Sequence, residues 1–190
     1  MAQRSDALGR GLLRFESPGL KMVIGHLQRG RKHHVLDLGP PLEANVAFFG
    51  RFPCRLYIQD LLRDAEPATG RKAALLQPSQ GERFSLILAW DLYNYLDSDS
   101  VSALMRDLGP HCLPGALLYL LLPTDDAIPA IPTRCVIIDE QHIERGPELP
   151  ETRNNPRLTP RAIERQTPGF RTLHSFLLNA GLQEHLLTYG

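Results

Sequence analysis

Two aspartates follow apolar runs at a spacing that suits nucleotide binding. The stretch VLDLGPPLEAN, residues 35–45, places Asp37 and Gly39 at the end of a short apolar run, and Asp60 ends the run CRLYIQ, 21 residues beyond Gly39. In dinucleotide-binding folds, an acidic residue about 20 residues after the glycine loop hydrogen-bonds the ribose hydroxyls. The spacing predicts a ribose contact for Asp60. An N-cap of the helical stretch that begins at Leu61 is an equally good interpretation.

A second group of polar and aromatic side chains follows the apolar run FSLILAW at 84–90. Ligands of open α/β folds bind at the carboxyl ends of the strands, which is where Trp90, Asp91 and Tyr95 would lie. Asp91 could orient a nucleophile or take its proton, and an aromatic ring could face a cation. In the alternative interpretation, Asp91 caps a short helix and the rings pack at the edge of the core.

Apolar runs that alternate with helical patterns predict a parallel sheet covered by helices on both faces. We expect strands at residues 33–38, 54–59, 72–77, 84–90 and 116–122, and helices at residues 19–29, 42–51 and 98–108, the last with Ser98 or Asp99 as N-cap. Near the C-terminus, residues 170–178 and 182–189 flank Asn179-Ala180-Gly181, which favours an antiparallel hairpin. A helix capped by Gly181 and followed by one strand is the alternative.

The domain organisation follows from length and proline content. The 190 residues suit a single domain, 1–190, with an N-terminal extension at 1–18. Eight of the sixteen prolines fall between Pro123 and Pro168, so residues 123–160 are interpreted as an insert or lid, in which RCVIIDEQHIER could form a small hairpin. Thr159 and Pro160 suit the start of a short helix.

Composition narrows the classes of partner. Lysine plus arginine and aspartate plus glutamate both number 21, so no excess of basic charge indicates nucleic acid or a membrane surface. The three cysteines are far apart and lack CxxC spacing, and the histidines are scattered, so neither a disulfide framework nor a metal site is expected. With no apolar segment long enough for a signal peptide or a membrane span, we expect a cytoplasmic protein.

The predicted order of elements resembles that of the class I S-adenosylmethionine-dependent methyltransferases. Four local matches carry the resemblance, which covers about Gly19 to the C-terminus: VLDLG at 35–39, YIQD at 57–60, FSLILAWDLYNYL at 84–96 and LPGALLYLLLP at 113–123. The resemblance implies a Rossmann-like three-layer α/β sandwich, with a mostly parallel seven-stranded sheet that ends in an antiparallel hairpin. It also implies S-adenosylmethionine as cofactor.

The resemblance further suggests roles for single residues. A cofactor would be bound by Asp37, Gly39, Pro41, Asn45, Asp60, Gln77 and Trp90, with Asp91 and Tyr95 as catalytic candidates. The chain departs from the D-x-G-x-G-x-G pattern of the family, because Pro41 stands at the second glycine and Glu43 at the third. Proline fixes φ and removes an N–H donor, so the loop would fit a cofactor differently.

Three functions are compatible with these patterns. The first is methyl transfer by in-line displacement to an unknown small-molecule or protein acceptor, by a monomer or homodimer. The second is an inactive binding or interaction protein of the same fold, with a decayed cofactor loop. A nicotinamide-dependent oxidoreductase ranks last, because the chain lacks GxGxxG and that class does not explain the terminal hairpin.

Overall fold

The computed structural model describes residues 11–28, 32–61, 81, 83–146, 150–179 and 181–190. Within them, a central six-stranded sheet has the order β10-β11-β5-β4-β2-β3. Its strands are β2 (His33–Asp37), β3 (Cys54–Ile58), β4 (Phe84–Trp90), β5 (Cys112–Pro123), β10 (Phe170–Leu178) and β11 (Leu182–Tyr189). The expected strand at 72–77 lies outside the described residues, so a seventh strand remains a prediction.

The inner strands are parallel and buried. β2 pairs with both β3 and β4, and β4 pairs with β5, each in parallel. Every residue of β2 and β4 is buried, which explains why the sequence of β4, FSLILAW, is almost wholly apolar rather than alternating between apolar and polar residues. Because the strands are parallel, their carboxyl ends meet at one edge of the sheet, where Asp37 ends β2 and Trp90 ends β4.

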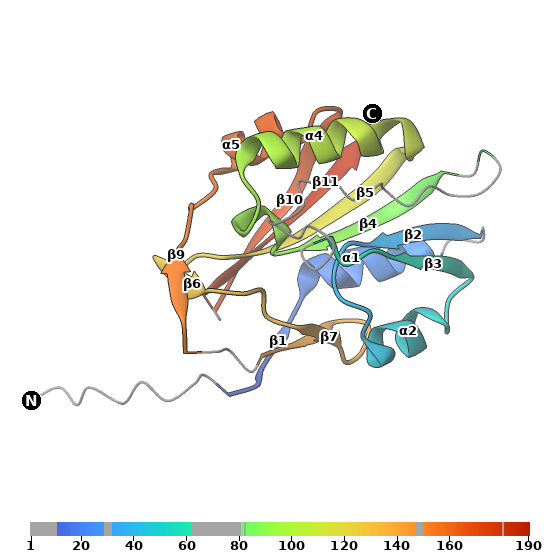
Figure 1. Ribbon diagram of the computed structural model, residues 1–190. Helices are drawn as coiled ribbons and strands as arrows, with labels where there is room; N and C mark the ends of the chain where they lie inside the picture. The colour runs from blue at the N-terminus through green and yellow to red at the C-terminus, as the bar shows by residue number, and fades with distance from the viewer. Residues whose placement is uncertain (1–10, 29–31, 62–80, 82, 147–149, 180) are drawn as a thin grey trace, which may run out of the picture.

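Helices cover both faces of the sheet, as Figure 1 shows. Helices α1 (Pro18–Leu27) and α2 (Glu43–Phe49) lie on one face, and α4 (Ser98–Leu108) and α5 (Pro160–Gln166) lie on the other. Two apolar clusters fill the spaces between the sheet and these layers. The chain is thus a three-layer α/β sandwich.

Two helix starts show how local sequence sets these elements. The N-cap of α4 is Asp97, one residue before the expected Ser98 or Asp99, because the Asp97 carboxylate accepts from the backbone N–H groups of Asp99 and Ser100. The start of α5 is as expected, since the Thr159 hydroxyl accepts from the Ala162 N–H at 3.2 Å.

Helix α1 is fixed to the sheet by a buried carboxylate. Glu184 of β11 is 0% exposed and accepts hydrogen bonds from the hydroxyls of Ser17 and Tyr119 and from the Gly19 N–H. A negative charge at the start of a helix is favourable with the helix dipole. Gly19 also allows close packing, since a Cβ there would lie 2.9 Å from the Tyr119 ring.

The C-terminal segments form the antiparallel pair that the sequence favoured. β10 pairs with β11, and β11 pairs with β5, both antiparallel. The alternative with a helix at residues 173–181 is wrong, because residues 170–178 are a strand. Its register shifts between Thr172 and His174.

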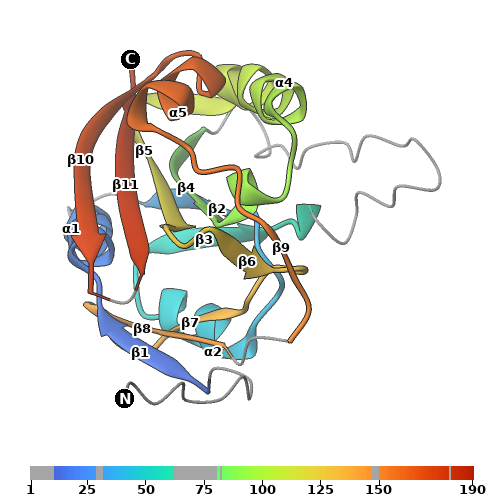
Figure 2. The same cartoon turned by 90° about the vertical axis from the view of Figure 1, so that its left-hand side faces the viewer.

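The segment between β5 and α5, interpreted from its proline content as an insert or lid, contributes strands to two small sheets. β7 (Cys135–Ile137) and β8 (His142–Arg145) are the expected hairpin, and β6 (Ala127–Pro129) pairs with β9 (Thr152–Asn154). The N-terminal segment joins the insert, because β1 (Leu13–Glu16) pairs antiparallel with β8. Figure 2 shows β1, β7 and β8 beside α2, away from the helices α4 and α5. Among the described residues, no helix is long and apolar enough to cross a membrane.

Candidate functional site

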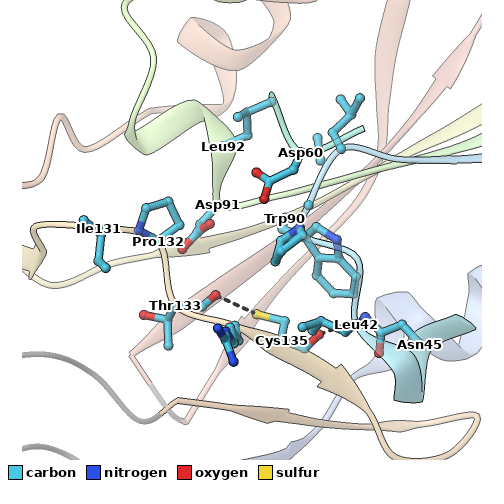
Figure 3. Close-up of a pocket in the computed structure, with 15 residues that line it drawn as sticks. Leu42, Asn45, Asp60, Trp90, Asp91, Leu92, Ile131, Pro132, Thr133 and Cys135 are labelled. Atoms are coloured by element: carbon cyan, nitrogen blue, oxygen red, sulfur yellow. Dashed lines mark hydrogen bonds between the residues drawn. The ribbon is translucent and has the colours of Figure 1, made fainter. Parts of the chain in front are cut away.

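A cavity of about 340 Å³ lies at the carboxyl ends of β2, β3 and β4. Its lining comes from the loops after these strands, from α2 and from the insert: Leu38, Gly39, Pro40, Leu42, Asn45, Asp60, Ala89, Trp90, Asp91, Leu92, Ile131, Pro132, Thr133, Arg134 and Cys135. Figure 3 shows Asp60 and Asp91 among the side chains around this cavity. Four separate segments of the sequence, at residues 38–45, 60, 89–92 and 131–135, thus line one cavity.

Backbone hydrogen bonds hold Asp60 beside the loop after β2. The Gln59 N–H donates to the Asp37 carbonyl at 2.8 Å, and the Leu61 N–H donates to the Leu38 carbonyl at 3.4 Å. Asp60 between them is half-buried on the cavity wall. Gly39 and Asp60, which the spacing of the sequence associates with one site, therefore line the same cavity.

Asp37 lies behind the cavity wall rather than on it. Its Oδ1 atom accepts from the Gly39 N–H at 2.9 Å and from the Trp90 Nε1–H at 2.7 Å. Burial raises the pKa of Asp37 to about 6, and the hydrogen bonds from Gly39 and Trp90 oppose that rise. The carboxyl group therefore links the loop after β2 to the end of β4.

Trp90 has an unusual backbone conformation, with a φ of 47°. The pairing of β4 with β5 shifts register between Leu88 and Trp90, and such an irregularity redirects the side chain that follows it. The indole lies against Gly39, where an added Cβ would be only 2.8 Å from Trp90 Cδ1. Gly39 is thus required by the packing of Trp90, in addition to any approach of a ligand.

Asp91 forms a buried ion pair with the insert. Its Oδ2 atom lies 3.8 Å from the Arg145 guanidinium of β8, and both side chains are at most 6% exposed. Burial raises the pKa of Asp91 to about 6, and the charge of Arg145 acts in the opposite direction. Asp91 makes no side-chain cap to the short helix η2 (Leu92–Asn94) that follows it.

The other expected site residues have different positions. The Asn45 amide lines the cavity but is engaged by the Cys135 carbonyl and the Ile137 N–H, which ties α2 to β7. Tyr95 is outside the lining, and its hydroxyl shares its one proton between the carbonyls of Pro129 at 3.0 Å and Ile131 at 3.2 Å. Pro41 is also outside the lining, and Gln77 lies outside the described residues.

Residues 131–135 form a roof over the cavity that sequence reasoning did not assign. The Tyr95 hydroxyl contacts the carbonyls of Pro129 and Ile131 at the start of this roof. The ion pair of Arg145 with Asp91 holds β8, the partner strand of β7. The proline-rich composition indicated an insert or lid. It carried no signal that these residues line the site.

Comparisons with known proteins bear on the fold. No protein-family model matches the sequence, and no curated protein matches it either. Among solved structures, an S-adenosylmethionine-dependent methyltransferase from Clostridium acetobutylicum has 13% identity and a TM-score of 0.53, over 90% of this chain and 88% of that chain. The CcbJ methyltransferase from Streptomyces caelestis has 13% identity and a TM-score of 0.52, over 90% and 94%.

A third similar structure was solved with ligands. It is the 1,6-didemethyltoxoflavin-N1-methyltransferase from Burkholderia thailandensis, with bound 1,6-didemethyltoxoflavin and S-adenosylhomocysteine. It has 18% identity and a TM-score of 0.51, over 90% of this chain and 76% of that chain. The chain described here therefore has the fold of the S-adenosylmethionine-dependent methyltransferases.

Proposed function

We propose that this protein is an S-adenosylmethionine-dependent methyltransferase whose cofactor binds in the cavity beneath the 131–135 roof. The observation that carries the proposal is that Gly39, Asp60 and Trp90 line one cavity at the carboxyl edge of the sheet. This edge is where open α/β folds bind their ligands. The fold similarity supports the choice of cofactor.

The residues at the cavity fit such a cofactor in three ways. The volume of about 340 Å³ lies within the range of small-molecule sites. The half-buried Asp60 carboxylate can accept hydrogen bonds from the two ribose hydroxyls. Trp90 presents an aromatic ring suited to a sulfonium cation, and Asp37 acts indirectly by holding that ring in place.

Asp91 is the candidate residue for the reacting end of the site. When bound, the cofactor supplies an electrophilic methyl group, so the protein must position an acceptor in line with it and exclude water. Asp91 lines the same cavity, and its pKa of about 6 leaves a carboxylate at neutral pH that can hold or accept an acceptor proton. The roof residues Pro132 and Thr133 line this cavity, and we propose that they limit the entry of water.

A thermal-unfolding titration with S-adenosylmethionine and S-adenosylhomocysteine tests the proposal. Ligand at 100 times its dissociation constant should stabilise the fold by about 2.7 kcal/mol. For a chain of this size, that corresponds to a rise in Tm of about 5 to 10 °C. Asp60→Asn should remove most of the rise, whereas Asp107→Asn, on the exposed side of α4, should retain it.

A second candidate function is ligand binding without methyl transfer. Its support is that Asp37 and Asn45 are both engaged in contacts within the protein, while Pro40 and Leu42 line the loop side of the cavity. In that case the loop after β2 has become structural. An unchanged Tm with both ligands at millimolar concentration would favour this second function over the first.

A further inference from the structure

Three charged side chains line the cavity, and they differ in how their charge is balanced. They are Asp60, Asp91 and Arg134. The charge of Asp91 is balanced by Arg145 at 3.8 Å. Under the proposed function, Asp60 binds the ribose hydroxyls. Arg134 is exposed, and it takes part in none of the ion pairs between described residues. A positive charge is therefore available at the roof.

Apolar surface adjoins this cation. Ile131, Pro132 and Leu92 line the same cavity. Ile131 is 55% exposed, although it is a large aliphatic side chain. The Tyr95 hydroxyl, which shares its proton between the Pro129 and Ile131 carbonyls, holds the backbone there. The roof thus offers a positioned apolar wall beside a guanidinium. Such a combination suits a ligand with an apolar body and an anionic group.

We propose that the methyl acceptor is a small molecule with an apolar body and a carboxylate or similar anion, and that Arg134 binds the anion. This inference rests on the proposed function. A cationic acceptor would meet both the Arg134 guanidinium and the positive sulfonium, and a neutral one would gain no ion-paired, charge-assisted hydrogen bond from Arg134. An anionic group held by Arg134 leaves the rest of the acceptor to lie between the apolar wall and Asp91.

Benzoate and its neutral analogue benzamide are suitable probes, because they share an apolar ring and differ in charge. Their dissociation constants can be measured by ligand-observed NMR titration, with and without saturating S-adenosylhomocysteine. Benzoate should bind about tenfold more tightly than benzamide, the effect of one charge-assisted hydrogen bond. Arg134→Met should remove this preference. Arg161→Met, an equal change of charge on the exposed side of α5, should leave it intact.

The outcomes separate this inference from the proposed function. Equal binding of the two probes, binding of neither, or an unchanged preference in Arg134→Met would overturn the anionic acceptor, even if S-adenosylhomocysteine raises the Tm. Weaker binding of S-adenosylhomocysteine to Arg134→Met, with benzoate unaffected, would assign Arg134 to the cofactor and also overturn it. A benzoate preference that depends on Arg134 without any response to S-adenosylhomocysteine would keep the anion site and reject the methyltransferase.

Discussion

The indole N–H of Trp90 donates to Oδ1 of Asp37 at 2.7 Å, and this bond joins the ends of two neighbouring parallel strands. Asp37 ends β2 and Trp90 ends β4, and the positive φ of Trp90 directs its ring onto the loop after β2. A strained backbone of this kind persists where surrounding contacts determine it. Here the Trp90 side chain contacts the Asp37 carboxyl group and packs against Gly39, which has no side chain.

Gly39→Ala should displace the Trp90 ring. The new Cβ would lie 2.8 Å from Trp90 Cδ1, closer than atoms can pack, so the ring or the loop must move. We expect a loss of about 1 to 3 kcal/mol in the free energy of unfolding, measured by urea denaturation. Gly25→Ala in α1 is the matched control, because nothing lies within 4 Å of the Cβ it adds. Equal stabilities of the two variants would mean that Trp90 does not pack on Gly39.

Asp37→Asn should change how stability depends on pH. The pKa of Asp37 in the folded protein is raised from 3.8 to about 6. Between these pH values, Asp37 is ionised in the unfolded chain but largely protonated in the folded protein. The contribution of Asp37 to stability therefore falls as pH rises through this window, by about 2 to 3 kcal/mol in total.

Asparagine does not titrate, so the variant should gain stability relative to the wild type between about pH 4 and pH 7. Urea denaturation of both proteins across that range gives the difference between their free energies of unfolding. The other carboxyl groups titrate in both proteins, so their contributions cancel in this difference. A difference that stays constant with pH would show that the pKa of Asp37 is not raised.

Arg145→Met should destabilise the protein most strongly above about pH 6. The variant leaves Asp91 buried without its ion-pair partner, and breaking a buried pair costs about 3 to 5 kcal/mol. Below the pKa of Asp91, which is about 6, the carboxyl group is neutral and the loss should be smaller. Chemical denaturation of the variant and the wild type, once below and once above pH 6, measures the loss of stability in each state of Asp91. The double variant Asp91→Asn, Arg145→Met should recover part of the stability, and no recovery would mean that Arg145 acts through other contacts.

The central strands and the terminal hairpin were predictable because their signals are local. β4 and β5 are long apolar runs, and a three-residue connection joins β10 to β11. The position of Asp60 in the same cavity as Gly39 was also predictable, since the spacing of the strands brings the two residues to one edge of the sheet, whereas its ribose contact stays a prediction. Hydrophobic periodicity can be read from the sequence, and it indicates the strands. The regular geometry of parallel strands then indicates which residues lie at the same edge.

The parts that sequence reasoning missed depend on contacts between distant segments. Trp90 and Asp37 are 53 residues apart, and no pattern indicates that a positive φ will bring them together. Likewise, β1 pairs with β8 more than a hundred residues later, and the roof residues 131–135 carry no periodic signal. The Asn45 amide could be read as a ligand contact, whereas in the structure it holds β7.

Trp90 allows the most direct test of the proposed cofactor site, because it is the only tryptophan in the chain and lines the cavity. Its fluorescence should therefore report a ligand bound there. Titration with S-adenosylhomocysteine should give a saturable change in tryptophan emission in the wild type and in Asp107→Asn, with at least tenfold weaker binding to Asp60→Asn. An emission that stays constant up to millimolar ligand, or an Asp60→Asn variant that binds as the wild type does, would contradict the proposal that this cavity holds S-adenosylmethionine.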